Sequence, residues 1–217
     1  SVVGTEVLGF DCGPGNALMD GWCQQHTGQP FDRGGAWAAS GRIHAPLLTR
    51  LLQEDYFAKA PPKSTGRDLF NTPWLAAQLS AFAQVSPVDV QATLTELTAI
   101  SCADSVIRHG DKSRELVVCG GGALNTHLMQ RLQANLPALA VSSSQAHGLP
   151  PLQVEATAFA WLARKTIRRE PASLQSVTGA QGARILGSIY PAWAGSDGVS
   201  GQAEKLEPQP QVEVAFG

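Results

Sequence analysis

A strand-like apolar run, a glycine-rich turn and a helical pattern follow one another twice in the 217 residues, over residues 7–16 and again over 116–125. This order constrains the fold more than any other feature of the sequence. Strands that alternate with helices are typical of α/β domains, in which helices pack on the faces of a sheet. The sequence therefore predicts a layered α/β domain, and a hydrophobic content of 43% supports a packed core.

The expected elements follow from hydrophobic periodicity and from residues that start or stop helices. Ser86, Pro87 and Asp89 are predicted to begin a long helix that ends before Gly110, and its many small residues predict packing on several sides. A flexible tail rich in Gly, Ser, Gln, Glu and Pro is expected over 194–217. The other expected elements are a strand or hairpin end over 1–10, helices over 16–27, 37–40, 44–54, 73–83, 125–135 and 154–169, a turn over 176–180, and strands over 116–119 and 139–141.

The first glycine turn is a candidate site for chemistry. Asp11 is expected at the exposed end of a strand, before the turn Gly13-Pro14-Gly15, and Asn16 is expected to cap the next helix. The N–H groups at a helix start suit an anion such as phosphate. A carboxylate beside such a site suits phosphoryl transfer, which needs a base next to a phosphate clamp. By themselves, these residues favour the alternative, a β-turn whose aspartate caps the helix.

The second glycine turn is Gly120-Gly121-Gly122. It does not match the dinucleotide pattern G-x-G-x-x-G, because the third glycine would fall on Asn125, and it lacks the lysine of a P-loop. This spacing disfavours a dinucleotide oxidoreductase. Alone, the turn fits a tight strand-to-helix connection at least as well as the close approach of a ligand. Two such turns could face one cleft, one taking phosphate and one taking the nucleoside, which resembles ATP binding in the sugar kinase, actin and Hsp70 architecture.

Composition excludes several classes of protein. The net charge is −2 and no cluster of basic residues occurs, so the sequence does not indicate a nucleic-acid-binding surface. The apolar stretches are too short to span a membrane. No two of the four cysteines have CxxC spacing, so a zinc site is not expected. Cys12, Cys23, Cys102 and Cys119 are interpreted as reduced thiols of a cytoplasmic protein, with Cys12 in a packing role.

Five motifs in order then identify a family. The run from Gly9 to Asn16 resembles the GFDxGPGN motif of the anhydro-N-acetylmuramic acid kinases. The resemblance covers about residues 5–193. The four further stretches that fit are PPKSTGRDLF from Pro61, DVQATLTELTA from Asp89, VCGGGALN from Val118 and EATAFAWLA from Glu155.

The resemblance implies a fold and an activity. The fold is one lobe of the actin- and hexokinase-like (ribonuclease H-like) ATPases, a mixed sheet flanked by helices. The family uses ATP and water to open 1,6-anhydro-N-acetylmuramic acid and to phosphorylate O6, which gives N-acetylmuramic acid 6-phosphate in peptidoglycan recycling. The resemblance also implies ATP and Mg²⁺ as cofactors, although the sequence names no protein ligand for the metal, and a cytoplasmic homodimer.

The same resemblance assigns roles to residues. Asp11 falls on the base that activates the attacking water, and Glu155 on a carboxylate of the sugar site; the alternative for Glu155 is an acid favoured by the helix dipole. Cations in the loop at 63–67 could meet phosphate or the sugar carboxylate, or the loop could be solvated or fix lobe geometry. The implied nucleotide-binding residues are Gly13, Pro14, Gly15, Asn16, Gly120, Gly121, Gly122 and Asn125.

The sequence departs from the family in one respect. Family members begin with a phosphate loop rich in Gly, Ser and Thr, and nothing like it occurs here. Residues 1–193 therefore resemble the C-terminal lobe alone, and the polypeptide by itself is expected to be inactive. The alternative from another class is a non-catalytic module of the same fold that binds a nucleotide or a partner.

Overall fold

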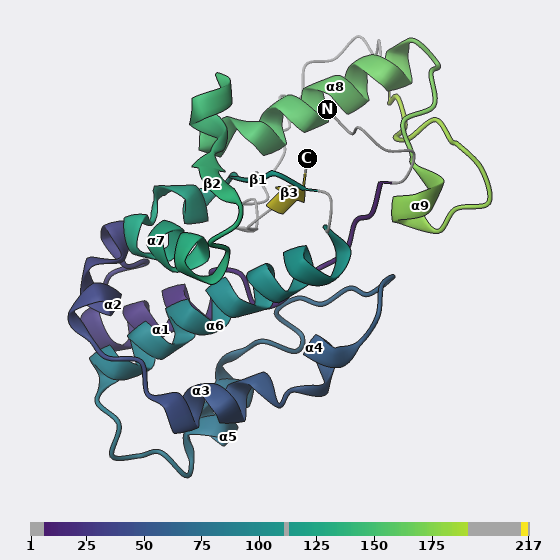
Figure 1. Ribbon diagram of the computed structural model, residues 1–217. Coiled ribbons are helices and arrows are strands. Elements are labelled where there is room, and N and C mark those ends of the chain that lie inside the picture. The colour runs from purple at the N-terminus through teal and green to yellow at the C-terminus, as the bar shows by residue number, and fades with distance from the viewer. Residues whose placement is uncertain (1–6, 111–112, 191–213, 217) are drawn as a thin grey trace, which may run out of the picture.

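The computed structural model describes residues 7–110, 113–190 and 214–216, and it consists of a helical body, a small sheet and one projecting helix (Figure 1). The long helix α6 runs through the body, and the sheet lies beside α7 (Figure 1). The helices are α1 Ala17–Thr27, α2 Ala36–Ser40, α3 Ala45–Leu52, α4 Asp55–Ala58, α5 Thr72–Leu79, α6 Pro87–His109, α7 Thr126–Asn135, α8 Val154–Ile167 and α9 Gln175–Thr178, and the strands are β1 Glu115–Val118, β2 Ala140–Ser143 and β3 Val214–Phe216.

The sheet has the strand order β2-β1-β3. β1 pairs in parallel with β2, with Glu115 opposite Ala140, and antiparallel with β3. The parallel pair is joined through α7, which packs on β2 and α6. Leu116 and Val118 point into the core and are fully buried. The structure thus confirms an α/β fold with a mixed sheet and flanking helices.

The body is organised around α6. Ser86 accepts a hydrogen bond from the backbone of Asp89 at 3.3 Å and donates one to its carboxylate at 2.7 Å, which confirms the predicted start. Small side chains let α1, α2, α3 and α7 approach α6 from several sides, as the sequence predicts. Leu94 and Leu97 lie at the centre of the hydrophobic core.

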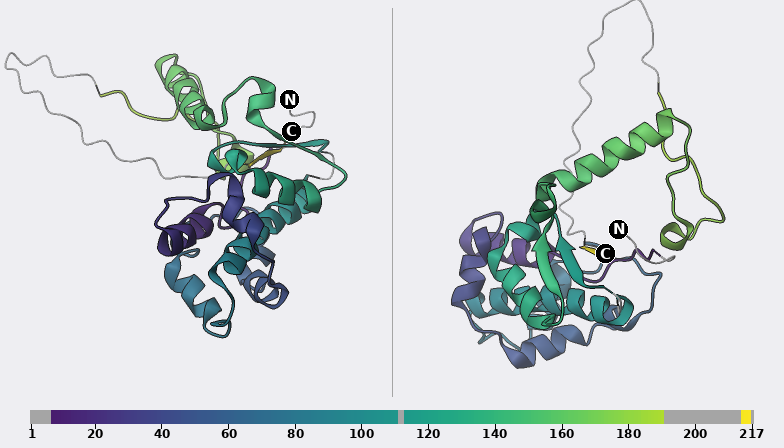
Figure 2. Two further views of the ribbon diagram at one scale, coloured as in Figure 1. Left: turned by 90° about the vertical axis from the view of Figure 1, so that its left-hand side faces the viewer. Right: turned by 45° about the horizontal axis from the view of Figure 1, so that its top comes forward.

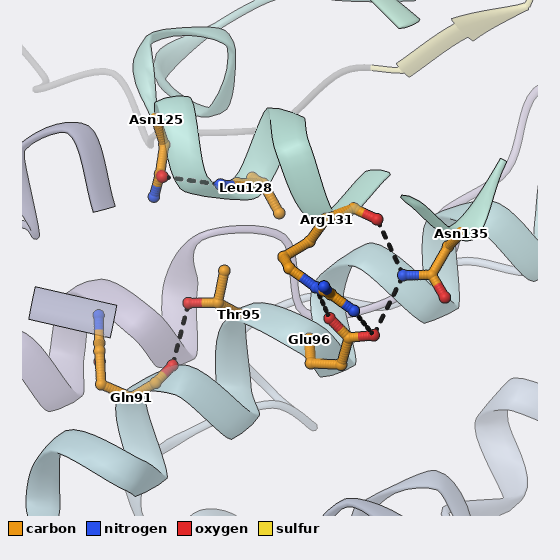
Figure 3. A network of polar contacts seen from close by, with 7 residues as sticks. All are labelled: Gln91, Thr95, Glu96, Asn125, Leu128, Arg131 and Asn135. Atoms are coloured by element: carbon orange, nitrogen blue, oxygen red, sulfur yellow. Dashed lines mark hydrogen bonds and ion pairs between the residues drawn. The ribbon is translucent and has the colours of Figure 1, made fainter. Parts of the chain in front are cut away.

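A buried polar network fixes α7 against α6 (Figure 3). Arg131 of α7 makes two hydrogen bonds to the carboxylate of Glu96 on α6, at 2.5 and 3.0 Å. Asn135 adds a third at 3.1 Å, so the nearly buried carboxylate is well satisfied. A buried charge is tolerated when it is paired and hydrogen-bonded, and such pairing specifies how two helices meet.

Several expectations need correction, among them the turn predicted over 176–180, where Gln175–Thr178 form the short helix α9. Residues 7–10 form no strand. The chain meets the 63–65 loop there instead, and the Asp11 N–H donates to the Lys63 carbonyl at 3.3 Å. The rest of that predicted strand lies outside the described residues. The helix predicted over 73–83 ends at Leu79, and the short α4 was not predicted. Residues 214–216 of the predicted tail form β3, whereas 191–213 and 217 lie outside the described residues.

Candidate functional site

Asp11 is an exposed residue whose side chain is held by a distant loop. Ser64 Oγ donates a hydrogen bond to Asp11 Oδ2 at 2.8 Å, and the backbone N–H of Thr65 donates to the same oxygen at 2.9 Å. The Tyr56 hydroxyl donates to the Asp11 carbonyl oxygen at 2.7 Å. Within the described ranges, both hydrogen bonds to this carboxylate go to Oδ2. The orientation of the carboxylate is therefore fixed, and Oδ1 is the oxygen through which it can accept a proton.

The cation of the same loop faces aromatic rings. Lys63 Nζ lies 4.9 Å from the centroid of the Tyr56 ring and donates to the Tyr56 carbonyl at 3.3 Å. Burial lowers the pKa of Lys63, and burial together with the nearby Asp11 raises the pKa of Tyr56 to about 12. Lys63, Ser64 and Thr65 all hold other parts of the chain and so fix the local geometry of the loop. The predicted roles toward phosphate, the sugar carboxylate or lobe geometry stay predictions.

The first glycine turn lies along α6. A Cβ added to Gly13 would lie 2.6 Å from Ser101 Oγ, and Thr98 Oγ1 donates to the Gly15 carbonyl at 2.9 Å. Pro14 is buried. The missing side chain of Gly13 is thus explained by close packing against α6.

Asn16 occupies the N-cap position of α1, but its side chain makes no capping hydrogen bond, so the predicted cap is wrong. Its backbone is helical, with φ −83° and ψ −12°, whereas a capping side chain needs an extended backbone. The Asn16 amide instead points to the second glycine turn: Nδ2 lies 3.4 Å from where a Cβ on Gly121 would be. Asn16 Oδ1 is buried without a partner among the described residues. The two glycine turns therefore lie next to one another; the predicted cleft that binds phosphate and nucleoside stays a prediction.

The second glycine turn connects β1 to α7 and to the start of α8. Gly120 has φ 70°, which favours glycine, and its N–H donates to the Pro151 carbonyl at 3.0 Å. Asn125 begins α7 as an N-cap, since its Oδ1 accepts from the Leu128 N–H at 2.9 Å (Figure 3). The side-chain oxygen of Asn125 is thus already hydrogen-bonded to the first turn of α7.

Glu155 lies in the first turn of α8 and is exposed. In the part of the chain that the structure describes, no hydrogen bond or ion pair joins Glu155 to Asp11 or to Asn16. Its described link to the site is indirect, through Pro151, which precedes α8 and binds Gly120. The structure therefore groups Asp11 with the 63–65 loop, and Asn16 with Gly121, but leaves Glu155 on a separate helix.

A second carboxyl group near the turn was not predicted. Asp20, one helical turn after Asn16, is half-buried, and burial raises its pKa to about 6 although Arg67 opposes the shift. Asp20 follows Asn16 by four residues, a spacing that places two side chains on the same face of a helix. This spacing is the sequence feature from which a second carboxyl group near the turn could have been predicted. Ser64 and Thr65 belong to a motif of the sequence, but their contact with Asp11 could not be predicted, because more than 50 residues separate the partners.

No group of three His, Cys, Asp or Glu side chains among the described residues could hold a metal ion. The described residues thus offer no protein cage for Mg²⁺, an ion that proteins often bind through one or two carboxylates together with phosphate oxygens. Across residues 7–110, 113–190 and 214–216, no helix has the length and apolarity needed to cross a membrane.

Comparisons with known proteins agree with these features. A family model described as anhydro-N-acetylmuramic acid kinase matches residues 2–192. Proteins of that name are 70% identical over 187 residues in Albidiferax ferrireducens and 68% identical over 186 residues in Variovorax paradoxus; each alignment covers 86% of this chain. A protein of the same name from Xanthomonas campestris is 55% identical over 186 residues.

The alignments cover 48%, 50% and 49% of those three relatives, so the chain spans about half the length of the curated relatives it matches. The family match extends over nearly all of residues 1–193, in which both glycine turns, Asp11 and Glu155 lie. The chain therefore belongs to the anhydro-N-acetylmuramic acid kinase family.

Proposed function

We propose that this chain forms the C-terminal lobe, residues 1–193, of an ATP-dependent kinase with the ribonuclease H-like fold. The enzyme opens 1,6-anhydro-N-acetylmuramic acid with water and phosphorylates O6, giving N-acetylmuramic acid 6-phosphate and ADP. The observation that carries this proposal is the oriented Asp11 carboxylate, which lies within the GFDxGPGN motif, two residues before a glycine turn that contacts the second one. The lobe contributes the base and part of the nucleotide site.

Asp11 acts as the general base in this proposal. Ser64 and Thr65 hold Oδ2, which leaves Oδ1 to accept the proton of the water that attacks the anomeric carbon. Breaking that bond frees O6 to attack the γ-phosphate. A fixed carboxylate assists because no reorganisation is needed when the proton moves.

The residues around Asn16 fit a nucleotide. A buried amide oxygen without a partner costs free energy unless a ligand or water satisfies it, and Asn16 Oδ1 is such an atom. Gly121 faces the same amide, and its lack of a side chain leaves the backbone accessible. ATP, when bound, supplies the phosphoryl group. In this proposal Gly13, Pro14 and Gly15 form the first turn of the nucleotide site, in which Gly13 packs on α6. Gly120, Gly122 and Asn125 form the second turn with Gly121.

Other parts of the proposal rest on the resemblance. Glu155 binds the sugar, which requires it to approach Asp11 in the complete enzyme. Mg²⁺ accompanies ATP in this proposal, with phosphate oxygens among its ligands. A cytoplasmic homodimer is the proposed assembly.

The experiment is a chimera in which this chain replaces the aligned half of the A. ferrireducens relative, with which it is 70% identical. A coupled assay should detect ADP release that depends on the anhydro-sugar, within about tenfold of the unmodified relative, since most lobe contacts are retained. The 217-residue chain alone should release none. A folded chimera that binds ATP but shows no sugar-dependent ADP release would contradict the proposal.

A further inference from the structure

Two cysteines that are far apart in the sequence meet behind the first glycine turn. Cys12 directly follows Asp11 and is half-buried, whereas Cys102 lies on α6 and is 3% exposed. Each thiol shifts the pKa of the other, so the two side chains lie near one another, and both cysteines are free. Two neighbouring thiols, unlike a lone cysteine, can be joined by a disulfide when their backbones lie close together.

The backbone holds this pair together without help from the thiols. Immediately after Cys12, Gly13 packs so closely on α6 that an added Cβ would lie 2.6 Å from Ser101 Oγ. Two residues further on, the Gly15 carbonyl accepts a hydrogen bond from Thr98 at 2.9 Å. The turn is therefore anchored along the same stretch of α6 that carries the second cysteine.

The two thiols differ in chemistry. The hydrogen bond from Cys102 is the main cause that lowers the pKa of Cys12, and Lys63 also lowers it, while burial and Asp11 oppose the shift. The hydrogen bond with Cys12 and burial raise the pKa of Cys102 well above its ordinary value. Because the thiolate is the reactive form, Cys12 is the attacking sulfur and Cys102 the resolving one.

We propose that Cys12 and Cys102 form a reversible redox pair that a hydroperoxide oxidises to a disulfide. The Cys12 thiol gives up its proton, the thiolate attacks a peroxide oxygen and the O–O bond breaks. The leaving hydroxide takes up that proton and departs as water, and Cys12 becomes a sulfenic acid. Cys102 then attacks the Cys12 sulfur; the S–S bond forms, the S–O bond breaks, and the hydroxide leaves as water with the Cys102 proton. Two thiols lose two electrons and two protons, and hydrogen peroxide becomes two waters. A dithiol restores the pair, which suits the transient disulfides of reducing compartments.

The experiment treats the reduced chain with hydrogen peroxide, blocks remaining thiols with an alkylating reagent in denaturant, and identifies peptides by mass spectrometry. The expected result is one linked pair of peptides, containing Cys12 and Cys102 and lighter by two hydrogen atoms than the separate peptides. Dithiothreitol should abolish it. Peroxide doses that oxidise Cys12 beyond sulfenic acid without any linked pair would overturn the proposal, and so would full alkylation of both cysteines.

Variants distinguish the two roles. In Cys102→Ser, Cys12 should stop at the sulfenic acid, which dimedone traps, and in Cys12→Ser the linked pair should be lost completely. Cys23→Ser is the matched control, because Cys23 is buried against Thr27 at 3.3 Å and should leave the yield unchanged. Linkage of Cys12 to Cys23 or Cys119 in the parent chain would also contradict the proposed pair. These readouts do not depend on kinase activity.

Discussion

The helices α6 and α8 are both rich in small and apolar residues, yet only α6 is buried. Leu97 of α6 is 0% exposed, whereas Phe159 and Trp161 of α8 are 63% and 46% exposed. α6 has α1, α2, α3 and α7 around it, and α8 extends away from the body in every view (Figures 1 and 2). Two helices that are both rich in small and apolar residues thus differ in how deeply they are buried.

The sequence of a helix thus indicates which of its faces are apolar enough to be buried. It does not indicate which other elements pack against those faces. A helix that is apolar on several sides is expected to be buried. The contacts that the structure shows for α8 include η4 Pro151–Gln153, which directly precedes it, and the Leu186 carbonyl, which accepts a hydrogen bond from Thr166.

The strongest test of the comparison is truncation in α6. Leu97→Ala should lower the free energy of unfolding by about 3 kcal/mol, because it removes a fully buried side chain and leaves a cavity. Urea unfolding followed by circular dichroism measures the change. Leu152→Ala, at a leucine that is 66% exposed just before α8, is the matched control and should change stability by less than about 0.5 kcal/mol. Equal losses of stability in the two variants would contradict the difference in burial between α6 and the region of α8.

A second test follows the pH dependence of stability that Asp20 of α1 gives to the packed body. Burial raises its pKa to about 6, so between about pH 4 and 6 the folded chain binds more protons than the unfolded chain. The free energy of unfolding therefore falls as pH rises through this range. Asp20→Asn should be more stable than the parent by ~1 kcal/mol at pH 7, after allowance for solvent screening, and equally stable near pH 4.

Urea unfolding of both proteins at the two pH values measures this difference. A parent chain that matches or exceeds the stability of Asp20→Asn at neutral pH would show that Asp20 is well solvated. The body around α1 would then be less tightly packed than the structure indicates.

The smallest effect is expected on α8. Phe159→Ser should change the free energy of unfolding by less than about 0.5 kcal/mol, because the ring is largely exposed and phenylalanine and serine have similar helix propensities. The same urea experiment applies. A loss of 2 kcal/mol or more, about the value of a buried aromatic side chain, would mean that α8 is packed within this chain.

The two asparagines show how much of the site could be predicted. Both were placed by sequence at helix starts, but Asn125 has an extended backbone and caps α7, whereas Asn16 has a helical backbone and does not cap α1. Local pattern located the turns, and tertiary packing decided where the side chains point. The bounds of α6 were predictable because its start and stop signals are local, while the contact of Ser64 with Asp11 was not, because it joins residues far apart.

The central claim is that Asp11 is the base and is oriented by the 63–65 loop. The direct measurement is the turnover number of Asp11→Asn in the chimera with the A. ferrireducens relative, with ATP affinity measured in parallel. Asp104→Asn, at an exposed aspartate of α6, is the control and should keep normal turnover. Asp11→Asn should bind ATP normally and lose about 10²- to 10⁴-fold in turnover, the usual contribution of a general base. Turnover close to that of the parent chimera would contradict the assignment.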